Sequence, residues 1–124
     1  MLVYGAALLM AEAAPRYFDR YVDGPFMIIA FDANERLAMD APATVHVDGT
    51  ARVQMVHKRV LPRYHALLKA FEERTGVPVL LNTSFNVKGE PIVFKTRDAL
   101  RTFWATGLEI LAIGPFVIRK PLVR

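Results

Sequence analysis

The chain contains no cysteine. This absence excludes disulfide bonds, a thiolate nucleophile and any zinc site built on cysteine ligands. It also excludes redox chemistry by the protein's own side chains, and it fits a cytoplasmic setting. We therefore predict a cytoplasmic protein whose chemistry does not involve sulfur.

Long apolar runs are also lacking. The apolar, alanine-rich stretch from Gly5 to Ala14 contains Glu12 and has no basic region before it. It is far shorter than the roughly 20 residues that a bilayer span needs. The stretch is therefore interpreted as a helix or a strand edge, not as a signal peptide, and no membrane partner is expected.

The sequence has no cluster of lysine and arginine. Its formal net charge is +4, but the basic residues are scattered and do not alternate with aromatic residues. A positive charge suits an anionic ligand, and without a nucleic-acid motif a small phosphorylated ligand is favoured over nucleic acid. His46, His57 and His65 do not share a metal-ligand spacing, so no metal site is predicted.

What the sequence does contain is enough apolar surface for a folded core. Of its 124 residues, 53% are apolar and 23% are charged, and there is no internal repeat. Such a composition argues against disorder and favours one domain, residues 1–124.

The first half of the chain predicts strands. The apolar, β-branched run from Phe26 to Phe31 is typical of a buried strand. Thr44 to Asp48 and Ala51 to Val56 alternate in polarity around Asp48-Gly49, a dipeptide that suits a tight turn, so these two segments are predicted to form a hairpin.

The second half alternates predicted helices and strands. One helix begins near Pro62 and ends at Gly76, with Tyr64, Leu67, Leu68 and Phe71 on its apolar face; a second is capped by Thr96, carries Ala99, Leu100, Phe103 and Trp104, and ends at Gly107. Short strands are predicted at Val77–Leu81, Ile92–Phe94, Ile110–Ile113 and Phe116–Ile118, the last two bent by Gly114-Pro115. The predicted fold class is α/β with a mixed sheet.

The loop after Leu81 is the most informative segment. It places Asn82, Thr83, Ser84 and Asn86 close together in the sequence. These neutral groups can hold phosphate or acyl-phosphate oxygens at the end of a strand, where sites on α/β sheets collect. The alternative is that the amides and hydroxyls cap their own turn, and the residues alone leave both interpretations open.

Charged residues near these segments have comparable alternatives. Arg52, on a predicted strand, can grip phosphate or carboxylate oxygens or lie in solvent. Lys88 can reach a phosphate or be an ordinary loop lysine, Glu90 is equally a surface carboxylate, and His46 flanks the turn that leads to Arg52.

Two segments together resemble the C-terminal region of the NodU-type carbamoyltransferases: His46 to Gln54 and Arg74 to Val93. The resemblance extends more loosely from Gly5 to Pro121 and includes Gly24-Pro-Phe-Met27. It implies a YrdC-like open twisted mixed sheet with helices packed on it, present here in part.

The resemblance also implies a function. The family binds ATP with magnesium, makes a carbamoyl adenylate from carbamoyl phosphate, and releases pyrophosphate and phosphate. The carbamoyl group then passes to a hydroxyl acceptor in a larger N-terminal domain of the actin/Hsp70-like type, which also holds a metal. By this resemblance Arg52 and Ser84 are catalytic, and Asn82, Thr83, Ser84, Asn86 and Arg52 bind the nucleotide.

The chain departs from the family at its start. Leu2 stands where the family has the arginine of an Arg-x-Pro-Phe stretch. We expect a truncated reading frame, a split gene product or an engineered boundary, and a partner domain in cis or in trans. The alternative is a catalytically inactive interaction module, as a homodimer, and a weaker one is RNA binding.

Overall fold

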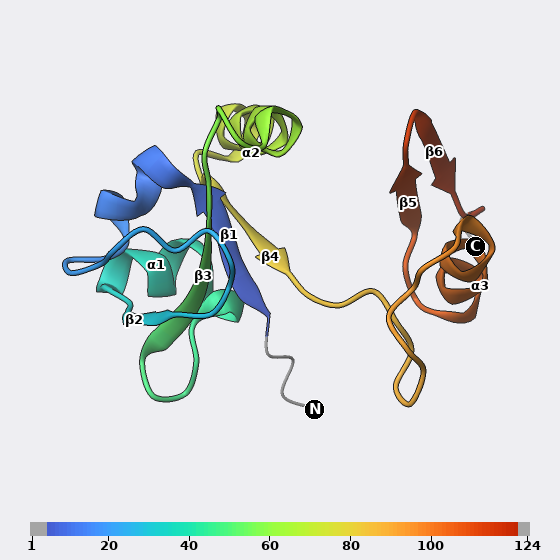
Figure 1. Ribbon diagram of the computed structural model, residues 1–124, viewed down its shortest axis with the longest axis horizontal. Helices are drawn as coiled ribbons and strands as arrows, with labels where there is room; N and C mark the ends of the chain where they lie inside the picture. Colours follow the sequence, from blue (N-terminus) through green and yellow to red (C-terminus); the bar gives the residue numbers. More distant parts are fainter. Residues whose placement is uncertain (1–4, 122–124) are drawn as a thin grey trace. The chain divides into compact units, whose positions relative to one another are not determined.

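The computed structural model describes residues 5–121 and divides the chain into two compact units, Met1–Thr83 and Ser84–Arg124 (Figure 1). Each unit is described by itself below. Leu2, where the sequence departs from the family pattern, lies outside the described residues. The interpretation of residues 1–124 as a single domain stays a prediction.

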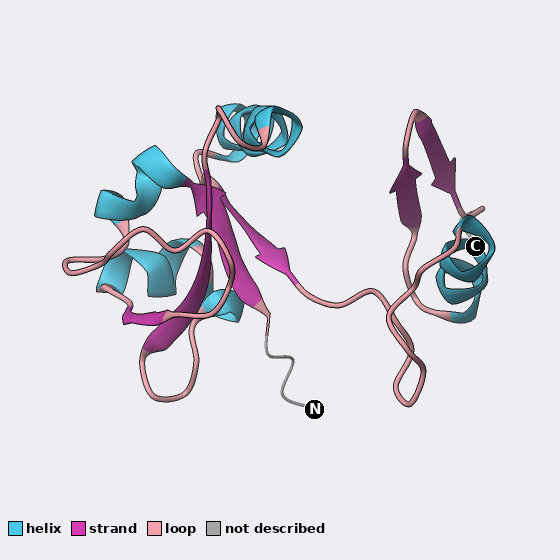
Figure 2. Cartoon of the chain, in the orientation of Figure 1, coloured by secondary structure: helices cyan, strands magenta, loops and turns pink. Residues whose placement is uncertain are grey.

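The first unit is built on a four-stranded mixed sheet (Figure 2). Its strands are β1 (Ala6–Met10), β2 (Ala30–Asp32), β3 (Thr50–Val56) and β4 (Val79–Asn82), in the order β2-β3-β1-β4. β1 runs parallel to β3 and antiparallel to β4, and β2 is antiparallel to β3. The prediction of an α/β fold with an open mixed sheet is confirmed.

The alanine-rich stretch near the N-terminus is the inner strand β1 and the 3-10 helix η1 (Ala11–Arg16) that follows it. All five residues of β1 are buried. Apolar side chains at every position suit a strand that has a neighbour on each side and a covering on each face. The core around it includes Tyr17, Phe18 and Leu68.

The remaining helices of the first unit are α1 (Glu35–Asp40), the 3-10 helix η2 (Pro42–Thr44) and α2 (Pro62–Thr75). α2 begins and ends as predicted, with Pro62 in its first turn and Gly76 after it at φ 78°. Its predicted apolar face is partly wrong: His65 and Leu68 are buried, whereas Tyr64 and Leu67 are exposed.

The predicted strand from Phe26 to Phe31 is wrong over most of its length. Only its end belongs to β2, and the Phe26 and Ile28 side chains are 73% and 80% exposed. The backbone of β3 forms two hydrogen bonds with this region: Val53 N donates to Ile29 O, and Met55 N donates to Gly24 O. Residues 25–28 bulge out between these two bonds, beginning at Pro25, which has no N–H to donate.

The predicted hairpin of Thr44–Asp48 with Ala51–Val56 is also wrong. The turn at Asp48-Gly49 exists, with Gly49 at φ 82°, but Thr44 ends η2 and the segment before the turn is not a strand. β3 pairs with β2 and β1 instead. Hydrogen bonds to two other strands stabilise β3 more than a hairpin with the preceding segment would.

The second unit contains α3 (Thr96–Ala105) and a hairpin of β5 (Ile110–Ile113) and β6 (Phe116–Arg119). The predicted final strand pair is confirmed, with Gly114 at φ 56° in its turn. Lys95, not Thr96, precedes the helix as its cap residue, and its backbone N–H donates to the Asp98 carboxylate.

The predicted strand at Ile92–Phe94 is wrong. This segment has no regular structure, and the Ile92 and Phe94 side chains are 68% and 91% exposed. Its apolar residues have no partner strand within the second unit, whose sheet consists of β5 and β6. Among residues 5–121, no helix has both the length and the apolar character needed to cross a membrane.

Candidate functional site

The alternation of β3 gives the sheet of the first unit a polar face. Ala51, Val53 and Met55 are buried in the core, whereas Thr50, Arg52 and Gln54 are half-buried on the other side of the strand. Side chains alternate along a strand with a period of two, so Gln54 lies on the same face as Arg52.

The strand register brings Asn82 onto this face. Ala7 is opposite Val53, which places Arg52 beside Ala6, and Ala6 is opposite Asn82. Arg52 and Asn82 therefore flank the small Ala6 side chain in one row, with their backbones roughly 10 Å apart at about 4.8 Å for each strand spacing. We call Arg52, Gln54 and Asn82 the polar face.

The amide of Asn82 orients that of Gln54. Asn82 Nδ2 donates to Gln54 Oε1 at 2.7 Å and to Met27 Sδ at 3.3 Å. A side-chain amide has two N–H donors, and both are used in these bonds. Gln54 is thus held by its oxygen, and no acceptor within residues 5–121 is bonded to its Nε2, which can donate to a ligand on the polar face.

Met27 adopts a conformation that is unusual for its residue type. It has a positive φ of 57°, and it is the one non-glycine residue with positive φ in the described part of the chain. A bulky side chain in this region is strained by roughly 1–3 kcal/mol, and such strain occurs often at functional sites. Here Met27 lies in the bulge of residues 25–28, and its sulfur accepts a hydrogen bond from Asn82.

The turn before β3 fixes the start of that strand. Asp48 Oδ1 accepts from the Thr50 hydroxyl at 2.7 Å and from Thr50 N at 3.0 Å, and the hydroxyl bond holds the pKa of Asp48 below its usual value. His46 Nδ1 lies 3.0 Å from the Thr50 hydroxyl oxygen. The single Thr50 proton is directed to Asp48, so His46 Nδ1 is the donor. His46 thus supports the turn that leads to Arg52.

The remaining amide and hydroxyl residues divide between the two units. Thr83, at the end of the first unit, and Ser84, at the start of the second, are exposed. Asn86 Nδ2 donates to Val87 O at 3.3 Å and to Glu90 O at 3.1 Å, so its donors cap its own loop. The convergence of Ser84 and Asn86 with Arg52 spans both units and stays a prediction.

The charged loop residues lie at the surface. Lys88 is exposed, and Glu90 pairs with Arg101 at 3.3 Å. Exposed pairs of this kind contribute about 0–1 kcal/mol. Within residues 5–121 no three histidine, aspartate or glutamate side chains gather closely enough to hold a metal ion.

Sequence reasoning missed Gln54 and Met27 as members of the site. A signal for Gln54 was present, since it lies two residues after Arg52 on a strand and therefore shares its face. Met27 was interpreted as part of a buried strand. Its position depends on the bulge, which the local sequence does not reveal.

Taken together, the first unit is an α/β fold that presents an arginine and an oriented amide on one face of a mixed sheet. The chain belongs to the carbamoyltransferase C-terminus family, whose family model matches residues 5–120.

Curated relatives agree with this assignment. The chain is 46% identical over 115 residues to the nodulation protein NolO of Bradyrhizobium diazoefficiens, an alignment that covers 90% of this chain and 21% of that protein. It is 32% identical over 109 residues to the 3'-hydroxymethylcephem-O-carbamoyltransferase of Amycolatopsis lactamdurans, covering 88% of this chain and 21% of that protein. The chain thus spans about a fifth of the length of these relatives.

Proposed function

We propose that this chain supplies ATP- and carbamoyl phosphate-binding residues of an O-carbamoyltransferase, in which a carbamoyl adenylate forms and its carbamoyl group passes to a hydroxyl acceptor. Membership of the family and the name of one relative support carbamoyl transfer. The structural observation that carries the proposal is the polar face, where Arg52 and the oriented Gln54 amide point to the same side of the sheet.

The polar face suits this chemistry. Hydrolysis of carbamoyl phosphate releases phosphate and gives carbamate, and an oxygen of this carbamate attacks the α-phosphorus of ATP with pyrophosphate as the leaving group. This attack spreads negative charge over the phosphoryl oxygens. Arg52 offers a planar fork of N–H donors that matches such oxygens, and the Gln54 amide adds neutral donors. Donors that are already oriented stabilise developing charge without reorganising, so no side-chain nucleophile is required.

Other groups complete the proposal. Thr83 and Ser84 would add hydroxyls for the phosphates, and magnesium would arrive bound to ATP. A partner domain of the actin/Hsp70-like type, in cis or in trans, would bind the hydroxyl acceptor and hold its own metal. Asn82 enters as the residue that positions Gln54, since its own donors are used.

Calorimetry with ATP tests the proposal. Arg52→Ala should weaken ATP binding about 10- to 150-fold, because a hydrogen bond to a charged group contributes roughly 1.5–3 kcal/mol. Ser84→Ala should weaken it less. Arg63→Ala removes an exposed arginine from α2 and is the matched control, with wild-type affinity expected.

Two results would contradict the proposal. If Arg52→Ala binds ATP as tightly as the wild type, the polar face is not the nucleotide site. If neither ATP nor carbamoyl phosphate gives heat with the wild-type chain, the inactive interaction module is favoured, and sedimentation would then show whether it is a homodimer. Heat with a short RNA alone would support the RNA-binding alternative.

A further inference from the structure

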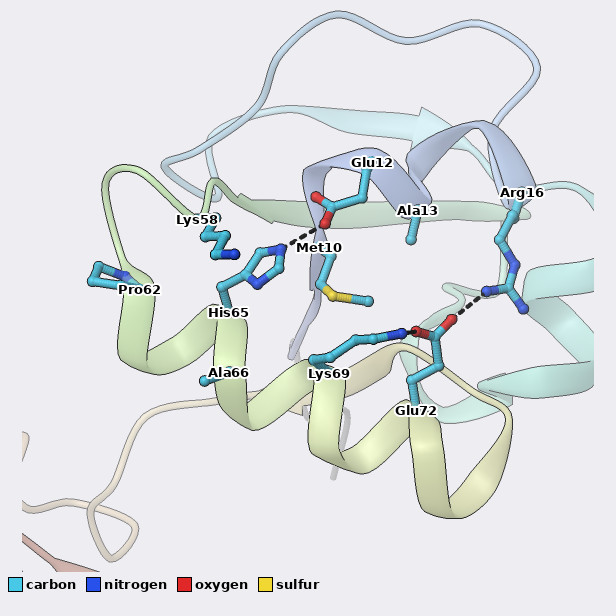
Figure 3. Close-up of a pocket in the computed structure, with 10 residues that line it drawn as sticks. All are labelled: Met10, Glu12, Ala13, Arg16, Lys58, Pro62, His65, Ala66, Lys69 and Glu72. Carbon is cyan, nitrogen blue, oxygen red and sulfur yellow. Dashed lines mark hydrogen bonds and ion pairs between the residues drawn. The ribbon is translucent and has the colours of Figure 1, made fainter.

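A pocket opens in the first unit and is lined by ten residues, none of which belongs to the polar face (Figure 3). It has a volume of about 450 Å³ and lies between η1 and α2. Met10, which contributes to its lining, is at the opposite end of β1 from Ala6. The pocket shares no residue with the polar face, so the proposed nucleotide site does not account for it.

Part of the lining of this pocket is apolar. Met10 and Ala13 are buried side chains of β1 and η1, and Ala66 contributes a methyl group from α2. Pockets of about 300–1,000 Å³ that combine apolar walls with a few polar groups are typical of small-molecule sites. The lining therefore suits a compact carbon skeleton.

One carboxylate in the pocket is already matched by two cations. Glu72 Oε1 lies 2.7 Å from Arg16 Nη1, and Glu72 Oε2 lies 3.1 Å from Lys69 Nζ. The bond from Lys69, together with that from Arg16, holds the pKa of Glu72 below its usual value. Glu72 thus stays ionised, and the Arg16 guanidinium is occupied, because its Nη1 donates to Glu72 and its Nη2 donates to Gly76 O at 3.4 Å.

The second carboxylate of the pocket, that of Glu12, is hydrogen-bonded to His65. Glu12 Oε1 lies 2.5 Å from His65 Nε2, and the His65 residue is only 8% exposed. Figure 3 draws this pair across the pocket, from η1 to α2, with the amine of Lys58 nearby. The interaction between Glu12 and His65 keeps the carboxylate occupied.

Lys58 is the cation of the pocket that has no partner among residues 5–121. It is exposed, it lines the pocket, and no hydrogen bond or ion pair involves its amine in this part of the chain. Among the lysine, arginine and acidic side chains of the lining, the three cations Arg16, Lys58 and Lys69 outnumber the two carboxylates Glu12 and Glu72.

We propose that this pocket binds the carboxylate of a small organic acid, with the Lys58 amine as its ion partner and its carbon skeleton against Met10, Ala13 and Ala66. The surplus of cations in the lining suits an organic anion. Lysine acts as a point charge, whereas the arginine fork that best fits a phosphate already donates to Glu72 and to Gly76 O.

Titrations followed by amide proton–nitrogen spectra test this inference with benzoate as the probe. Benzoate should shift the backbone signals of Ala13 and Ala66 in a saturable way. Benzyl alcohol, which keeps the ring and lacks the charge, should bind about 2- to 5-fold more weakly, and inorganic phosphate should bind more weakly than benzoate. Absence of a saturable shift, or tighter binding of phosphate, would overturn the assignment.

Two variants separate the charge from the shape of the pocket. Lys58→Met should weaken benzoate binding about 2- to 5-fold, as expected for one exposed ion pair. Ala66→Phe places a large side chain from α2 in the pocket and should abolish binding. Lys95→Met removes a lysine from the second unit and should leave binding unchanged. Equal affinity in all three variants would place benzoate elsewhere and refute the inference.

The outcome is independent of the proposed function. ATP affinity should be the same in Lys58→Met as in the wild type, because the pocket and the polar face share no residue. Loss of ATP binding in that variant would show that the pocket belongs to the nucleotide site and would contradict a separate acid site.

Discussion

The bond between Asn82 and Gln54 makes a sharp prediction about how the polar face works. If Asn82 acts by orienting Gln54, its removal should matter only while Gln54 is present. A double-mutant cycle of Asn82→Ala and Gln54→Ala measures this directly. The 2.7 Å bond joins two half-buried amides, and each single substitution leaves the other amide short of its partner.

The expected magnitudes follow from this bond. Each single variant should lose about 1–2 kcal/mol of unfolding free energy, and the double variant should lose about 1 kcal/mol less than the sum. Gln54→Ala should weaken ATP binding roughly 3- to 10-fold, as expected for one neutral hydrogen bond. Asn82→Ala should have a similar effect alone and almost none in the Gln54→Ala background.

The assay must report on the first unit. The one tryptophan of the chain, Trp104, lies on α3 in the second unit, so its fluorescence would follow the wrong unit. Urea unfolding should instead be followed by amide signals from residues 5–83, and ATP binding by calorimetry. Additive effects on ATP affinity would refute the reasoning, since they would mean that Asn82 contacts the nucleotide itself.

Two further predictions concern stability. Burial and the bond from its hydroxyl to Asp40 raise the pKa of Tyr17 from 10.0 to about 12. The neutral phenol therefore contributes fully to the stability of the fold below pH about 10, and this contribution is lost as the pH rises toward about 12. Tyr17→Phe should therefore cost about 0.5–1.5 kcal/mol at neutral pH and flatten the alkaline loss of stability, which urea unfolding at several pH values would show. Gly76→Ala should cost about 1 kcal/mol in urea unfolding, since Gly76 ends α2 at φ 78° and the added methyl group meets no atom within 4 Å. Gly107→Ala, without a positive φ and with equal space, should be neutral, and an equal loss in both variants would exclude a conformational cause.

The sequence predicted those elements whose signals are local. Pro62 and Gly76 bound α2, and Gly114-Pro115 marks the turn between β5 and β6. Proline and glycine act through their own backbone angles, so their effects can be read without knowing what packs nearby. The family resemblance was equally local, because it rests on contiguous runs of residues, and the family match over residues 5–120 confirms it.

Predictions failed where a segment's structure depends on its neighbours. Ile92–Phe94 has the composition of a strand, but within residues 5–121 it pairs with no strand and its one backbone bond joins Val93 N to Phe85 O. Most of Phe26–Phe31 bulges away from the edge of the sheet. The predicted face of α2 failed for a related reason, since helical spacing fits several faces and packing selected the one with His65 and Leu68. Composition measures the tendency to form an element, whereas a strand also requires a ladder of bonds to another segment.

The amino-acid sequence by itself determined the α/β class, the limits of the longest helix, the family, and Arg52 as a candidate ligand-binding residue. Only the tertiary structure decided that Asn82 orients the Gln54 amide, that Met27 accepts the second bond from Asn82, and that a charged pocket lies beside α2. The reason is physical: backbone preferences act over a few residues, but the side chains that meet on a sheet face are chosen by strand order and register.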